Sequence, residues 1–175
     1  MITRPMSTEF APYYEKYVSQ VPDGDIVAVL REQSGELGRL FGRVGPADEL
    51  FRYGPDKWTF RSVAGHLIDA ERVFGLRAFC FSRGERSPLP SFDENAYVAA
   101  GGYDAVPLAA LVKEFVTVRE ANLQFLGRLS EAEWMRQGTA SGHGITVRAL
   151  AWIMAGHVVH HRGILLERYA GGLSR

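Results

Sequence analysis

The chain of 175 residues has one cysteine, no surplus of charge of either sign and no long apolar run. A single cysteine, Cys80, excludes an intramolecular disulfide and a zinc site built from cysteines. Any metal must therefore be held mainly by histidine or carboxylate. Twenty Lys+Arg balance twenty Asp+Glu. Because no basic run is long enough to follow a phosphate backbone, we expect no nucleic-acid partner.

Apolar stretches of the kind needed for membrane insertion or export are missing as well. The first twenty residues contain no apolar signal region, and no later stretch reaches the roughly 18 apolar residues that a span requires. We therefore expect a cytoplasmic protein with no membrane partner. Hydrophobic residues make up 46% and charged residues 23% of the chain, the balance of a soluble protein long enough to bury one core.

Apolar residues recur at spacings of three and four along most of the chain, which is typical of amphipathic helices. Four long helices are predicted, with start signals at the PDGD stretch 22–25, Thr59, Pro107 and Thr146. The first is expected to end near Gly45-Pro46, the second before Gly84, and the fourth to cover about 147–169. Ser130 and Glu133 match a capping box, which predicts a short helical turn before the fourth helix.

The link between the second and third helices, residues 85–106, is much longer than the connections between antiparallel neighbours in a bundle. Such a link allows a crossover along the bundle. The sequence therefore predicts an all-α fold, a four-helix bundle with a long crossover between helices two and three. We divide the chain into an N-terminal arm (1–22), a bundle domain (23–170) and a tail (171–175).

The segment GHVVHHRG, residues 156–163, places three of the five histidines inside the most apolar helix. His157 and His161 share its buried face one turn apart, the spacing by which two helical histidines bind one metal ion. His160 lies at the edge of that face. A histidine on an apolar face is more often a hydrogen-bonded core residue, but coordination would offset the cost of burying two imidazoles.

A third ligand is available in the second helix, where AGHLIDAE contains His66. The helical pattern puts His66 at the flank of the buried face, a position that suits either an ion between two helices or a half-exposed histidine. Cys80 is too far along the same helix to share an ion with it, and we assign Cys80 to the core. We expect His143, within SGHGIT, to be a loop residue.

Two carboxylates of the second helix lie close to His66 in sequence. Asp69 or Glu71 could orient a histidine ligand through its second ring nitrogen, or act as a catalytic acid or base. The more common interpretation of both is a solvated surface charge. The three tryptophans, Trp58, Trp134 and Trp152, are assigned to the core or to packing at helix ends.

The segments PDKWTFRSVAGHLIDAE (55–71) and AGHVVHHRGILLERY near the C-terminus resemble the DinB/YfiT-like family, which includes low-molecular-weight-thiol transferases. The resemblance covers about residues 23–170. It implies a four-helix bundle of up-down-down-up order and a divalent metal with three histidine ligands, here His66, His157 and His161. Where many relatives carry a glutamine soon after the last ligand, this chain has Arg162, Gly163 and Ile164.

The resemblance also implies a function. We expect a metal-dependent enzyme that transfers a low-molecular-weight thiol to an electrophilic small molecule, with zinc or nickel as the ion and Asp69 or Glu71 handling protons. One alternative is a metal-dependent hydrolase that activates water. Another is a non-enzymatic stress protein in which the ion only holds two helices together. The family is often dimeric, so a homodimer is expected.

Overall fold

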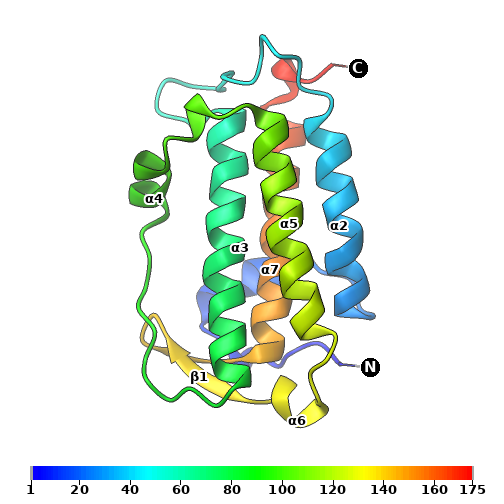
Figure 1. The fold of residues 1–175 in the computed structure, drawn as a ribbon, viewed down its shortest axis with the longest axis vertical. Helices are drawn as coiled ribbons and strands as arrows, with labels where there is room; N and C mark the ends of the chain where they lie inside the picture. The colour runs from blue at the N-terminus through cyan, green and yellow to red at the C-terminus, as the bar shows by residue number, and fades with distance from the viewer. Residues whose placement is uncertain (1, 175) are drawn as a thin grey trace.

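The computed structural model describes residues 2–174, and four long helices standing side by side make up most of it (Figure 1). Two of them run upward in the view of Figure 1 and two run downward, in the chain order up-down-down-up. This confirms the predicted four-helix bundle. The helices are α2 (Ile26–Phe41), α3 (Phe60–Ser82), α5 (Leu108–Leu126) and α7 (Val147–Arg168).

Side-chain caps begin three of these helices where the sequence predicts them. The side chains of Asp25, Thr59 and Thr146 accept hydrogen bonds from backbone N–H groups in the first turns of α2, α3 and α7. Pro107 is the N-cap residue of α5. The Ser130 capping box starts the short helix α6 (Glu131–Trp134).

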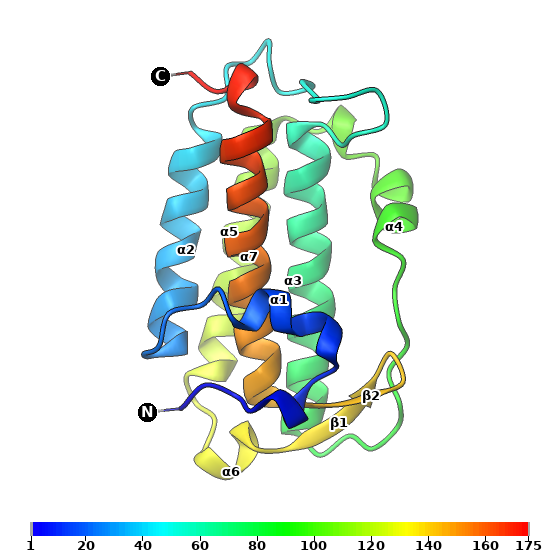
Figure 2. The same ribbon diagram turned by 180° about the vertical axis from the view of Figure 1, so that it is seen from behind.

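The predicted crossover connects the lower end of α3 to the upper end of α5. Since both helices run downward, residues 83–107 must return along the bundle, and Figures 1 and 2 show them doing so on the outer side of α3. The return contains the helix α4 (Glu94–Gly101) and a 3-10 turn at Tyr103–Ala105. The crossover thereby becomes one wall of the bundle.

Two local expectations were wrong. The first long helix ends at Phe41, four residues before Gly45. The Gly-rich stretch before α7 is a two-stranded antiparallel hairpin, not a loop: β1 (Gln137–Ala140) pairs with β2 (His143–Thr146). His143 therefore begins a strand, where it is exposed.

The N-terminal arm crosses α7 through the short helix α1 (Glu15–Val18), as seen from behind in Figure 2. Its residues Tyr17 and Val18 are buried in the bundle core. An ion pair and two hydrogen bonds join Glu9 of the arm to Arg148 of α7, and both residues are buried. The arm is therefore packed as part of the bundle.

The core contains two apolar clusters, one above the other along the helices. The lower cluster includes Phe74 of α3 and Met154 of α7. The upper cluster includes Leu67 of α3 and Leu165 of α7. On α7, His157 lies between Ala155 of the lower cluster and Val158 of the upper one, and on α3, His66 lies between Ala64 and Leu67 of the upper cluster. The polar site therefore interrupts an otherwise apolar interior.

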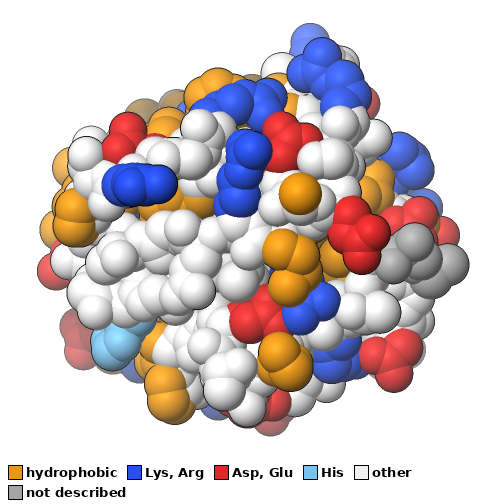
Figure 3. All heavy atoms as spheres, turned by 90° about the horizontal axis from the view of Figure 1, so that it is seen from below, with side chains coloured by type: hydrophobic (Ala, Val, Ile, Leu, Met, Phe, Trp, Pro, Cys, Tyr) orange, Lys and Arg blue, Asp and Glu red, His pale blue; other side chains and the backbone are white. Residues whose placement is uncertain are grey.

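Within residues 2–174, no helix has the length and apolar character that a membrane crossing requires. The lower end of the molecule, viewed in Figure 3, shows Lys, Arg, Asp and Glu side chains interspersed with hydrophobic ones. This mixture agrees with the balanced charge of the sequence.

Candidate metal centre

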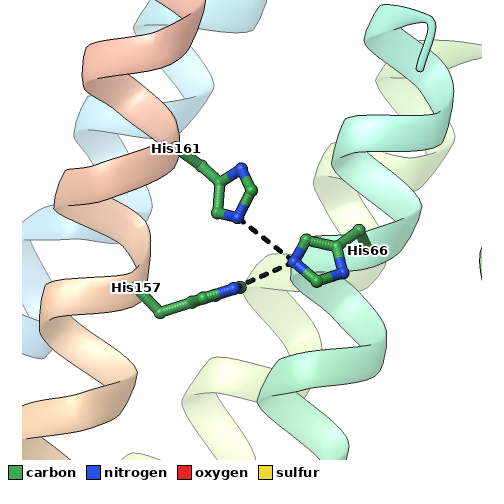
Figure 4. Close-up of side chains that lie close together, drawn as sticks. All are labelled: His66, His157 and His161. Carbon is green, nitrogen blue, oxygen red and sulfur yellow. Dashed lines mark hydrogen bonds between the residues drawn. The ribbon is translucent and has the colours of Figure 1, made fainter. Parts of the chain in front are cut away.

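Three buried histidines from two helices converge inside the bundle (Figure 4). The Nε2 atom of His66, on α3, lies 2.9 Å from Nε2 of His157 and 3.1 Å from Nε2 of His161, both on α7. All three side chains are at most 8% exposed. The fold thus brings together the three residues that the sequence analysis named as metal ligands.

The helix geometry explains the convergence. His157 and His161 are four residues apart, so they project from the same face of α7 one turn apart. That face packs against α3, which carries His66. His66 is only 2% exposed, whereas the helical pattern alone placed it at a flank. The indole of Trp58 lies 4.8 Å from its ring, centroid to centroid, and helps to cover it.

Burial keeps these imidazoles neutral. Desolvation lowers the pKa of His66 to about 4, with His160 adding a smaller effect of the same sign. Burial also holds the pKa values of His157 and His161 well below the usual value of 6.5, and the neighbouring histidines reinforce the shift. Near pH 7 the three rings are therefore uncharged, the form that binds a metal ion.

The donor set fits a divalent cation. Nitrogen atoms about 2.0–2.1 Å from one ion lie roughly 3 Å apart in tetrahedral or octahedral arrangements, close to the separations of 2.9 and 3.1 Å found here. Three neutral imidazoles cannot all satisfy one another, because each ring carries only one N–H. A cation at the centre would use the converging lone pairs.

The other two histidines lie outside this cluster. His160 is half-buried on α7, and its ring packs edge-on against Tyr17 at 5.4 Å between centroids. His143 is exposed on β2. Cys80 is half-buried against the lower core cluster.

The carboxylates near His66 differ from each other in their surroundings. Asp69 is half-buried and accepts a 2.6 Å hydrogen bond from the hydroxyl of Tyr103. Burial raises the pKa of its carboxyl, while the Tyr103 hydrogen bond opposes that shift. Glu71 is 3% exposed, so the interpretation as a solvated surface charge was wrong for it. Arg119 donates to both of its oxygens, at 2.7 and 2.8 Å.

A cavity of about 220 Å³ opens beside His161. A second cavity of about 480 Å³ shares two of its lining residues, Trp58 and Asn95. Trp58 therefore lines a cavity, in addition to the packing role expected from the sequence, and Asn95 was not predicted at all. The first cavity is lined by Tyr53, Asp56, Lys57, Trp58, Val63, Asn95, His161, Ile164 and Tyr169.

The chain departs from the family pattern at Arg162 and Ile164, and these two side chains have different surroundings. The guanidinium of Arg162 pairs with Glu36 of α2 at 2.5 Å. Ile164 lines the cavity beside His161. The side of the cavity formed by α7 is therefore apolar at this position.

Solved structures with the same fold include YfiT from Bacillus subtilis, described as a probable metal-dependent hydrolase with an unusual four-helix bundle topology. It is 18% identical with a TM-score of 0.76, over 97% of this chain and 94% of that one. A mycothiol-dependent maleylpyruvate isomerase is 18% identical with a TM-score of 0.66, over 82% of this chain and 60% of the isomerase. A DinB-like protein from Bacillus subtilis is 19% identical with a TM-score of 0.59, over 87% of this chain and 99% of the other.

A search of curated proteins by sequence found no match. At these identities the solved structures establish the fold alone. The model of the DinB superfamily, however, matches residues 30–165, which is more than half of the sequence. The chain belongs to the DinB superfamily.

Proposed function

We propose that the chain is a metal-dependent enzyme acting on a small molecule, with His66, His157 and His161 as the ligands of a divalent ion. The observation that carries this proposal is the convergence of three buried, neutral imidazoles at 2.9 and 3.1 Å beside a cavity. Three protein ligands and an open position are the arrangement of a catalytic site, not of a closed structural one.

Zinc or nickel is the ion that we propose, because imidazole suits both. Bound there, the ion would lower the pKa of a thiol or of water and so supply an anionic nucleophile at neutral pH. The chain's own residues provide the surroundings of this chemistry. The histidines supply neutral donors, the two core clusters exclude bulk water, and Trp58 both packs on His66 and lines the two cavities.

The reaction that we propose is transfer of a low-molecular-weight thiol to an electrophilic substrate. The mycothiol-dependent isomerase of the same fold supports it. The second candidate is metal-dependent hydrolysis, favoured by the likeness to YfiT over nearly the whole of both chains. Of the two carboxylates predicted to handle protons, Asp69 is the one that we retain as a proposal, because burial raises the pKa of its carboxyl, whereas Glu71 is held in a buried ion pair with Arg119.

Two measurements test this function. Elemental analysis of the purified protein should find about one zinc or nickel per chain, and His157→Ala should lose it. His143→Ala is the matched control, since it removes an exposed histidine on β2. Thiol conjugation to a model electrophile should then disappear on chelation and in His157→Ala, whereas it persists in His143→Ala.

The same preparations separate the candidate reactions. A panel of thiols with a model electrophile is compared with ester and amide substrates in the absence of thiol. Turnover of the second group alone would favour the hydrolase. Metal-dependent stability without turnover of any substrate would favour a non-enzymatic role. We also propose a homodimer, which sedimentation equilibrium would test.

A further inference from the structure

Two buried polar atoms on α3 have no hydrogen-bond partner among residues 2–174, and they lie one helical turn apart. One is Nδ1 of His66, the ring nitrogen opposite the converging Nε2. The other is Oδ2 of Asp69. A buried donor or acceptor without a partner costs about 1–3 kcal/mol, so both atoms call for an explanation.

The His66 ring shows why its second nitrogen needs an acceptor. In Figure 4, Nε2 faces His157 and His161 while Nδ1 points away from them. A neutral imidazole that gives its Nε2 lone pair to a metal ion carries its hydrogen on Nδ1. That N–H then requires an acceptor on the far side of the ring.

Asp69 is placed to supply this acceptor. Residues 66 and 69 are separated by three positions, so they share one face of α3. Tyr103 occupies the other carboxylate oxygen, since its hydroxyl donates to Oδ1 at 2.6 Å. The remaining oxygen, Oδ2, lacks a donor. The Nδ1–H of His66 therefore needs an acceptor, and Oδ2 of Asp69 needs a donor.

Tyr103 reaches Asp69 because two glycines make room for its ring. A Cβ atom at Gly65 would lie 2.1 Å from Cδ2 of Tyr103, and a Cβ atom at Gly101 would lie 2.4 Å from its Cε2. Any side chain at Gly65, the residue before His66, would push the tyrosine ring away. The crossover is thus fitted onto α3 beside the candidate metal centre.

We propose that Asp69 is a positioning residue for the metal centre: its Oδ2 accepts the Nδ1–H of His66, directly or through one water, while Tyr103 holds its Oδ1. The inference rests on the proposed function, since it assumes an ion at the three histidines. A carboxylate on the second nitrogen fixes the orientation of a histidine ligand and increases its basicity. The long crossover then supports the metal centre through Tyr103.

Metal affinity is the direct test. Zinc affinity is measured by competition with a chromophoric chelator for the wild type, Asp69→Ala, Asp69→Asn and Tyr103→Phe, with exposed Glu120→Gln as the matched control. Asp69→Ala should weaken zinc binding by roughly 10- to 100-fold. Asp69→Asn keeps one acceptor oxygen and Tyr103→Phe keeps the carboxylate, so both should lose less. Glu120→Gln should bind as the wild type does.

The visible spectrum of the cobalt-substituted protein adds a readout that a purely structural role would not change. The absorption bands should shift in Asp69→Asn. Asparagine has the same side-chain shape as aspartate, so the packing is kept while the donor strength of His66 changes. The melting temperature of each metal-free variant reports whether it is folded. If Asp69→Ala does not fold, Asp69→Asn carries the test.

The possible failures are distinguishable. Wild-type zinc affinity and unshifted cobalt bands in both Asp69 variants would overturn the positioning role while leaving the metal centre intact. Lost turnover with unchanged zinc affinity would also overturn it and would favour proton handling by Asp69. A wild-type protein that binds neither zinc nor cobalt would overturn the proposed function, and this inference with it.

Discussion

Two glycines of α7 differ sharply in what surrounds them. The backbone of the N-terminal arm crosses α7 at Gly156, where a Cβ atom would lie 2.1 Å from the carbonyl oxygen of Tyr17. Gly163, two turns further on, is exposed and has nothing within 4 Å of that position. Only the first glycine is required by a close approach between backbones.

We therefore expect opposite effects from the same substitution. Gly156→Ala should lower the free energy of unfolding by roughly 1–3 kcal/mol, because the arm must move away from α7. Gly163→Ala should raise it by about 0.5–1 kcal/mol, since alanine loses less backbone entropy in a helix. Urea unfolding of both variants checks this. Equal effects of the two substitutions would contradict the close packing of the arm.

The candidate site shows which properties of single residues can be predicted from the sequence and which cannot. The placement of His157 and His161 together on one buried face was predicted from their spacing, because both lie on one helix, and the family resemblance implied their role as ligands. The burial of His66 comes from contacts with other segments, among them Trp58 before α3 and the histidines of α7. The burial of Glu71 depends on Arg119, 48 residues away. No local pattern encodes such distant partners.

Between elements, a buried ion pair connects helices of the bundle. Arg119 of α5 is fully buried and binds Glu71 of α3 through two hydrogen bonds. It also donates to the backbone of Leu30 and to the side chain of Gln33, both on α2. Gln33 in turn donates to the carbonyl of Ala155 on α7. The network reaches all four long helices.

Removing one partner would leave a buried charge without compensation. Glu71→Ala should cost about 3–5 kcal/mol of the free energy of unfolding. The control is Glu114→Ala, which removes the exposed pair between Arg72 and Glu114 and should cost at most about 1 kcal/mol. Urea unfolding followed by circular dichroism measures both. A loss below 1 kcal/mol in Glu71→Ala would show that Arg119 finds another partner.

Elements were predictable where local chemistry defines them. The caps at Thr59 and Thr146 gave the starts of two helices to the residue, and the stretch 22–25 contains Asp25, the cap of α2. The hairpin of β1 and β2 was missed because its strands have four residues each and contain glycine, so they lack an alternating pattern. Helix α4 was missed because its apolar residues form no clear stripe.

At the scale of the whole molecule, an ion at the three histidines would join α3 to α7 and so contribute to global stability. A ligand present at about 1,000 times its Kd stabilises a folded protein by roughly 4 kcal/mol, which for this length raises the melting temperature by roughly 10 °C. Chelation should lower the melting temperature of the wild type by that amount. The metal-free His66→Ala variant should show no change with chelator, and His143→Ala should behave as the wild type.

The metal-free protein should also lose stability as the pH falls below about 6.5, because its buried histidines resist protonation. Burial lowers the pKa of His66 to about 4 and holds those of His157 and His161 well below 6.5. In the unfolded chain the same groups have ordinary pKa values near 6.5. As the pH falls from 6.5 towards 4, the unfolded state therefore binds protons that the folded state does not. Each histidine contributes a slope of about 1.4 kcal/mol per pH unit.

Urea unfolding in chelator at pH 7.5, 6.0 and 5.0 measures this slope above the range in which ordinary carboxylates titrate. Asp69, whose pKa burial raises, acts in the opposite direction. Glu9 and Glu49, whose pKa values are lowered in the folded state, act only below about pH 4.5. Half-buried His160 adds to the slope in the same direction. His66→Gln removes one titrating group, so its slope should be shallower by about 1.4 kcal/mol per pH unit. A stability that stays constant from pH 7.5 to 5.0 would mean that the histidines reach water and take up protons in the folded state, which is incompatible with a buried set of neutral ligands.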